Sequence, residues 1–126
     1  MNRHFDPDQS PPGPKTDLLL LHHVFDWKPG IAAFGQAAYV VPVKGGGISN
    51  EPILWPVSVD WAYAQKAIGL LEGRGFHINV APDSPSGFVV RITCVIGAVE
   101  SRAETPALAF TRAALKGVVT CLIVKN

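Results

Sequence analysis

The sequence predicts a mixed α/β fold in a single domain, with a largely antiparallel sheet and two amphipathic helices at about 59–72 and 106–116. The chain has 126 residues, the length of one domain, and 48% of them are hydrophobic, enough to build a core. Two segments carry apolar residues at helical spacing, each with a polar residue that can cap its start. Apolar segments of strand length lie around them, bounded by glycine and proline turns.

The N-terminal part of the chain divides into a tail and an apolar segment. Residues 1–15 are polar and contain the run Pro11-Pro-Gly-Pro14, so we expect an extended or disordered tail ahead of one domain over 16–126. Thr16–Trp27 is apolar, and both helix and strand remain open for it. Thr16 or Asp17 can cap a short helix at its start. Alternate residues also form one side of a strand: Leu18, Leu20, His22 and Val24.

The next segment is expected to hold one strand and two loops. Lys28-Pro-Gly30 closes the preceding element. Ala37–Val43 predicts a strand at a sheet edge, because Pro42 has no N–H to donate to a neighbour. The run from Lys44 through its three glycines to Asn50 predicts a flexible loop.

The helix at about 59–72 has recognisable ends. Ser58 is expected to cap it, Asp60 suits the positive end of the helix dipole, and Gly73 lies where the chain leaves it. Its predicted buried face consists of Trp61, Tyr63, Ala64, Ala67, Ile68, Leu70 and Leu71.

Two strands are expected to follow, Phe76–Val80 and Phe88–Ile96, joined by the turn 82–87. The second is apolar on both sides apart from Arg91 and Thr93, which predicts a central strand covered on both faces.

The closing helix has the clearest start in the chain, because Thr105 can cap it and Pro106 suits its first position. Arg112 and Lys116 are placed on its solvent edge, and Gly117 is expected to end it. Val118–Val124 then predicts a final strand. Its predicted buried face consists of Ala107, Leu108, Phe110, Ala114 and Leu115.

Composition argues against several classes of function. The formal net charge is +1, with basic and acidic residues scattered, so the clustered basic surface of nucleic-acid and membrane-surface binders is missing. Charged residues make up 17%, below the ~25% usual for soluble domains, which favours a surface covered by a partner. No apolar run approaches the ~20 residues of a membrane span, and no basic secretion signal is found. We therefore expect a cytoplasmic protein, with Cys94 and Cys121 as buried free thiols in strands.

The order of these elements resembles a known family. Ser58-Val-Asp-Trp-Ala-Tyr-Ala64, a hairpin begun by Gly75-Phe76, and Ala103-Glu-Thr-Pro-Ala-Leu-Ala109 followed by Arg112-Ala-Ala-Leu-Lys-Gly117 resemble the phage ABA-sandwich domain, a family of small phage and prophage proteins. The resemblance covers Val57 to Gly117. It implies a small α-β-α sandwich and a phage or prophage origin, and it implies no reaction. The chain departs from the family pattern before residue 57 and after residue 117.

No motif predicts catalysis, a metal or a cofactor. The three candidate metal ligands lack the spacing of a zinc site, and Ser84 and Ser86 lie in a proline turn without a nucleophile motif. The glycine loop lacks the order of a phosphate-binding loop, and the start of the last helix is acidic at Glu104, unlike that of a double-stranded RNA binder. The residues considered were His22, His23 and His77 for metal, and Asp26, Asp60, Asp83 and Glu104 as paired carboxylates.

The function predicted from these observations is binding of a host protein, without catalysis, by a phage or prophage accessory protein in the cytoplasm of the bacterial host. Inhibition of a defence system, such as a CRISPR–Cas effector, is one instance. The alternative is a small-ligand or nucleotide-signal sponge that uses the glycine loop with Arg91 or Arg112. A weaker third hypothesis is an enzyme whose site forms across a homo-oligomer interface, and the sequence leaves the oligomeric state open.

The candidate partner-binding surface combines loop-end tryptophans, the glycine loop and the basic edge of the last helix. Tryptophan at the end of an element is favoured in protein interfaces. The predicted residues are Trp27, Lys44, Gly45, Gly46, Gly47, Trp55, Arg112 and Lys116.

Overall fold

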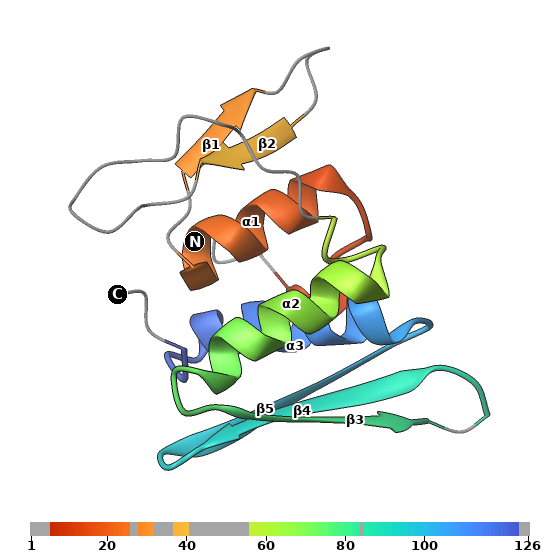
Figure 1. The fold of residues 1–126 in the computed structure, drawn as a ribbon. Coiled ribbons are helices and arrows are strands. Elements are labelled where there is room, and N and C mark those ends of the chain that lie inside the picture. The colour runs from red at the N-terminus through yellow and green to blue at the C-terminus, as the bar shows by residue number, and fades with distance from the viewer. Residues whose placement is uncertain (1–5, 26–27, 32–36, 41–55, 84, 124–126) are drawn as a thin grey trace.

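A computed structural model describes residues 6–25, 28–31, 37–40, 56–83 and 85–123 (Figure 1). A three-stranded sheet forms one layer, and helices α2 and α3 lie across one of its faces, with α1 beyond them and a two-stranded hairpin outermost. The elements are the 3-10 helix η1 (Pro7–Gln9), α1 (Pro14–Phe25), β1 (Lys28–Ile31), β2 (Ala37–Val40), α2 (Trp61–Glu72), β3 (His77–Pro82), β4 (Phe88–Cys94), β5 (Gly97–Ala103) and α3 (Pro106–Val119).

The predicted fold class is confirmed: three helices and a three-stranded antiparallel sheet packed against helices form a mixed α/β domain. The sheet has the order β3-β4-β5, so β4 is the central strand, as predicted. Its side chains alternate, because Val90 and Ile92 are buried under the helices while Arg91 is exposed on the outer face. The predicted cover on both faces of this strand is therefore wrong.

The strand β5 was not predicted. The apolar run expected to end at Ile96 stops at Cys94, because Val95 and Ile96 form a two-residue turn between the paired residues Cys94 and Gly97. On β5 the helix-facing positions include Ser101, which is buried. Its burial is tolerated because its Oγ donates a hydrogen bond to Oδ1 of Asp8 at 2.7 Å. A polar residue at an inward position breaks the alternation by which strands are recognised.

Helix α3 is the centre of the molecule. Its predicted start is confirmed: Oγ1 of Thr105 accepts the N–H of Leu108 at 3.2 Å, and Pro106 follows. It packs on β4, β5, α1, α2 and η1, which explains why it is buried on nearly all sides. Its buried residues are Ala107, Leu108, Ala109, Phe110, Thr111, Ala113, Ala114, Leu115 and Gly117.

The predicted end of this helix at Gly117 and the final strand over 118–124 are wrong. The helix continues to Val119, and the chain then folds back so that the N–H groups of Leu122 and Ile123 both donate to the carbonyl of Gly117, at 2.8 and 3.0 Å. A Cβ on Gly117 would lie 2.7 Å from Cδ1 of Ile123. The glycine is thus needed for close approach of the returning chain and does not stop the helix.

The N-terminal region differs from its prediction in two ways. The open choice for Thr16–Trp27 is decided in favour of helix, because α1 buries Leu20, Leu21 and Val24 completely. The expected tail is wrong for residues 7–15, since η1 and the start of α1 form there and both Pro7 and Ser10 are buried.

The hairpin β1–β2 pairs two short strands in antiparallel register. Its second strand confirms part of the predicted Ala37–Val43 strand, while Pro42 lies outside the described residues. Its first strand stands where a closing loop at Lys28-Pro-Gly30 was expected.

Helix α2 confirms the helix predicted at about 59–72, but its cap is Asp60 and not Ser58. Oδ1 of Asp60 accepts the N–H of Ala62 at 2.9 Å, and Gly73 ends the helix as expected. Leu70, predicted on the buried face, is 42% exposed. Among the described helices, none combines the length and the apolar character that crossing a bilayer requires.

Candidate functional site

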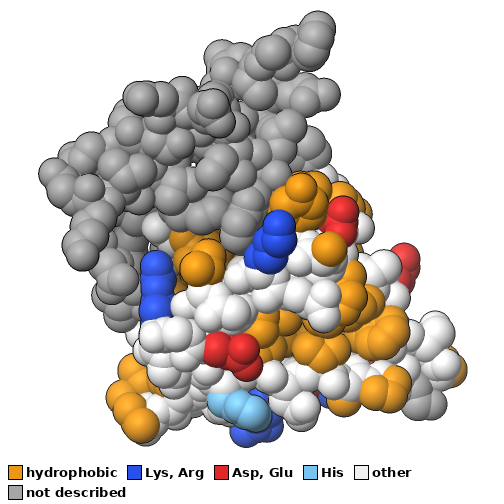
Figure 2. Space-filling model, viewed as in Figure 1, with side chains coloured by type: hydrophobic (Ala, Val, Ile, Leu, Met, Phe, Trp, Pro, Cys, Tyr) orange, Lys and Arg blue, Asp and Glu red, His pale blue; other side chains and the backbone are white. Residues whose placement is uncertain are grey.

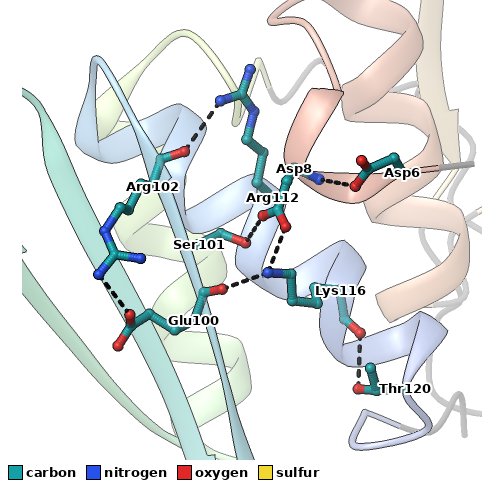
Figure 3. A network of polar contacts seen from close by, with 8 residues as sticks. All are labelled: Asp6, Asp8, Glu100, Ser101, Arg102, Arg112, Lys116 and Thr120. Carbon is teal, nitrogen blue, oxygen red and sulfur yellow. Dashed lines mark hydrogen bonds and ion pairs between the residues drawn. The ribbon is translucent and has the colours of Figure 1, made fainter.

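The structure describes only part of the predicted partner-binding surface. Trp27, Lys44, the Gly45–Gly47 loop and Trp55 lie outside the described residues, and with them the loop on which the ligand-binding alternative depends. Arg112 and Lys116 lie on α3, both half-buried. Their predicted place on a solvent edge is wrong, because both side chains reach across to β5 and η1 (Figure 3).

Arg112 and Lys116 close the outer edge of β5. Lys116 Nζ donates to the carbonyl of Glu100 at 2.8 Å, and Arg112 Nη1 donates to the carbonyl of Arg102 at 3.1 Å. The two cations are four residues apart on α3, and the two carbonyls are two residues apart on β5. The distance along the helix between the cations is therefore close to the distance along the strand between the carbonyls. These side chains therefore satisfy backbone groups within the molecule.

The same two cations hold the N-terminal strap, Pro7–Ser10. Lys116 Nζ lies 2.7 Å from Oδ2 of Asp8 (Figure 3). Arg112 Nε donates to the carbonyl of Ser10 at 2.9 Å. Burial by itself raises the pKa of Asp8, but hydrogen bonds from Lys116 and Ser101 and the positive charges of Lys116 and Arg112 outweigh it, so the pKa lies below 3.8. The carboxylate is thus held in its charged form.

A second buried carboxylate joins α1 to the segment before α2. Oδ1 of Asp17 accepts the N–H of Ser58 at 2.7 Å, and Oγ of Ser58 accepts the N–H of Gly13 at 2.9 Å. Burial raises the pKa of Asp17 above 3.8, against the lowering effect of the hydrogen bonds from Ser58. This contact explains why Ser58 does not cap α2, since its side chain and N–H are used elsewhere.

The other candidates for chemistry are spread over the fold. Among the described residues, no group of three or more His, Cys, Asp or Glu side chains is placed to hold a metal ion. His22 and His23 contact each other edge-on on α1, with ring centroids 4.8 Å apart, whereas His77 lies on β3. Asp83 lies 3.2 Å from Nε of Arg102, and Asp60 caps α2.

Both cysteines are free, as predicted. The predicted strand position of Cys94 is confirmed, but its full burial is wrong, and for Cys121 both the strand and the burial are wrong. Cys94 ends β4 and is half-buried. Cys121 lies in the turn after α3 with a φ of 64° and is exposed. The misplacement follows from the unpredicted fold-back at Gly117.

Among the residues whose burial the structure describes, the most exposed large hydrophobic side chains lie in the β4–β5 turn. Val95 is fully exposed (103%) and Ile96 is 72% exposed. Figure 2 shows hydrophobic side chains at the lower left, where Figure 1 places this turn. Neither residue has a positive φ, so the turn lacks the backbone geometry that two-residue hairpin loops favour. Such loops usually contain Gly, Asn or Asp and not two β-branched hydrophobic residues.

We name Val95 and Ile96 the apolar turn, and it is the candidate protein-binding site among the described residues. β-branched side chains do not favour the backbone conformation of a turn, and exposing their apolar surface to water is unfavourable. The sequence pattern does not reveal the site, because both residues continue the apolar run of a predicted buried strand. The signal that could have found it is Gly97, a residue typical of turns that directly follows the apolar run.

Comparisons with known proteins support the fold and nothing finer. No family model matches the sequence, and no curated protein matches it. The 2.0 Å crystal structure of a phage protein from Bacillus cereus ATCC 14579 superimposes with a TM-score of 0.60, over 94% of this chain and 96% of that chain. This chain is similar in fold to a phage protein. The sequence identity is 19%, so the similarity concerns the fold alone.

Proposed function

We propose that this chain is a non-enzymatic phage or prophage accessory protein that binds a host protein through the apolar turn. The observation that carries the proposal is the exposure of Val95 and Ile96 at the end of the paired β4–β5 hairpin. The fold similarity to a phage protein and the sequence resemblance to the phage ABA-sandwich family support the phage origin. Within this proposal, a cytoplasmic defence component such as a CRISPR–Cas effector is the first partner class to test.

The apolar turn has the properties of an interface anchor. Its side chains project from a paired hairpin, so little conformational entropy is lost when a partner covers them. Truncation of a buried anchor in an interface commonly costs ~2 kcal/mol or more, which is more than a ten-fold loss of affinity. Because Val95 is fully exposed and Ile96 is 72% exposed, the same truncation should change stability by no more than ~0.5 kcal/mol.

The test compares the wild type with the double variant Val95→Ser and Ile96→Thr as affinity baits in bacterial host lysate, followed by quantitative mass spectrometry. A captured protein is then purified and its affinity measured directly. Val59→Thr is the matched control, because Val59 is also exposed (59%) but lies outside the turn. The proposal requires at least a ten-fold loss for the double variant, with normal melting temperature and normal binding by the control. Equal binding by all three proteins would contradict it.

A further inference from the structure

The two edges of the β3-β4-β5 sheet are treated differently. The β5 edge is closed, because Lys116 and Arg112 occupy the carbonyls of Glu100 and Arg102. At the other edge, β3 pairs with β4, and no further strand joins it in the described part of the chain. Exposed strand edges usually carry charges, bulges or prolines that discourage pairing with other chains.

The register shows which backbone groups lie on the open edge. The N–H of Asp83 donates to the carbonyl of Gly87 at 3.0 Å, in the same register as the rest of the β3–β4 pair. Because hydrogen-bonded pairs alternate in an antiparallel ladder, His77, Asn79 and Ala81 direct their N–H and C=O groups towards β4. Ile78 and Val80 therefore direct theirs outwards.

The closed edge supports this assignment independently. The backbone N–H and C=O groups of Arg91 point towards β3. Arg91 and its β5 neighbour Glu100 are therefore a pair without mutual hydrogen bonds, so the carbonyl of Glu100 points away from β4, where Lys116 contacts it. The same holds for Val89 and Arg102.

The open edge is apolar. No charged residue lies between Arg74 and Asp83. Figure 2 shows hydrophobic side chains along the side where α2 lies over β3. Partly buried side chains from both elements contribute to this region of the core: Trp61, Ile68, Phe76, Ile78 and Val80. Pro82 removes one donor, but only at the end of the strand.

We propose that β3 pairs with β3 of a second copy of this chain, antiparallel and centred on Asn79, and joins the two sheets into one. In this register Ile78 stands opposite the partner's Val80, and both residues exchange N–H···O=C bonds through groups for which the described part of the monomer provides no paired strand. Their side chains meet on the helix side and extend the two apolar cores. On the outer face, Asn79 meets its own copy and His77 meets the partner's Ala81.

Charge and polarity favour a second copy as the occupant. The nearest charged residues have opposite signs at the two ends of the strand, Arg74 before it and Asp83 after it. Antiparallel pairing sets Arg74 of one copy at the same end of the joint as Asp83 of the other, so like charges do not meet across it. Within each copy Arg74 donates to the carbonyl of Val24, and Asp83 pairs with Arg102. One strand pair with a narrow apolar border is smaller than the ~1,600 Å² of a standard interface, so the dimer should dissociate at about micromolar concentrations.

Sedimentation equilibrium between about 1 µM and about 1 mM tests the pairing. The wild-type mass should rise from 13.5 kDa towards twice that value. Val80→Pro removes an outward N–H without removing a hydrogen bond to β4, and it should weaken the dimer at least ten-fold. The control Val80→Ala loses similar packing but keeps the N–H, and it should still dimerise. A wild type that stays monomeric, or a folded Val80→Pro variant that dimerises normally, overturns the proposal.

Cross-linking tests the register without relying on the proline variant. In a Cys121→Ser background, Asn79→Cys places a thiol opposite its own copy at a non-hydrogen-bonded position, where Cα atoms are ~4.5 Å apart, and it should oxidise to a disulfide-linked dimer. His77→Cys lies on the same exposed face but stands opposite the partner's Ala81, and it should cross-link at least ten-fold more slowly. Equal rates at the two positions, or no cross-linking at residue 79, would overturn the proposed register.

Discussion

Lys116 Nζ lies 2.7 Å from Oδ2 of Asp8, and this contact attaches the N-terminal strap to α3. Because the pKa of Asp8 is lowered in the folded state, its charge stabilises the fold above pH 3.8, and the contribution is lost as the pH falls through the lower folded pKa. The pair is partly exposed, so Asp8→Asn should cost up to about 1 kcal/mol at pH 7. Urea denaturation of both proteins at pH 7 and near pH 3 should show the difference shrinking in acid, whereas a constant difference would contradict the assignment.

Asp17 should show the opposite dependence on pH. Burial raises its pKa in the folded state, so the wild type loses stability relative to Asp17→Asn as the pH rises above 3.8. The asparagine keeps an oxygen that can accept the N–H of Ser58, whereas Asp17→Ala leaves this buried donor unpaired at a cost of ~1–3 kcal/mol. Chemical denaturation at pH 7 should therefore rank the asparagine variant at or above the wild type and the alanine variant below it. Equal losses for both variants would show that the charge itself is required.

Two glycines should respond in opposite directions to the same substitution. A Cβ on Gly69, inside α2, meets nothing within 4 Å, so Gly69→Ala should stabilise the protein by ~0.5–1 kcal/mol through helix propensity. Gly87 has a φ of 112°, and its Cβ would lie 2.7 Å from the carbonyl oxygen of Ala103, so Gly87→Ala should destabilise it by more than about 1 kcal/mol. Thermal melts of both variants check the signs, and a stabilised Gly87→Ala variant would contradict the turn geometry.

The two free thiols should differ in reactivity. Cys121 is exposed and Cys94 is half-buried, so a thiol reagent under native conditions should modify Cys121 at least several-fold faster. Cys121→Ser should remove the fast phase and leave the slow one, and mass spectrometry identifies the modified residue. A fast phase that persists in this variant would show that the β4 end is open to solvent.

Local signals in the sequence predicted α2 and the start of α3, because a cap and a helical apolar face are properties of neighbouring residues. The features that were missed depend on tertiary contacts that the residue pattern does not show. Ser101 occupies an inward position of β5 only because Asp8 accepts its hydrogen bond. The extension of α3 past Gly117 depends on Ile123 folding back over it.

The candidate site also depends on contacts that local sequence signals do not show. Arg112 and Lys116 were selected as exposed basic residues, and only the positions of β5 and η1 reveal that their donors are used internally. The apolar turn became visible once Val95 and Ile96 were separated from the strand that precedes them. Whether an apolar side chain lies in the core or in a turn depends on where the strand ends, and here the end is set by pairing with β5.

The strap also has a consequence for the order of folding. α2, the sheet and α3 are consecutive in the chain, so their contacts close short loops. The contact of Arg112 with Ser10 spans 102 residues, and closing so long a loop is entropically costly until the rest is in place. The amide of Ser10, which donates to the carbonyl of Pro7, should therefore exchange with solvent through a local opening that leaves the buried Ile92 undisturbed. We expect the N-terminal segment to fold last and to open first.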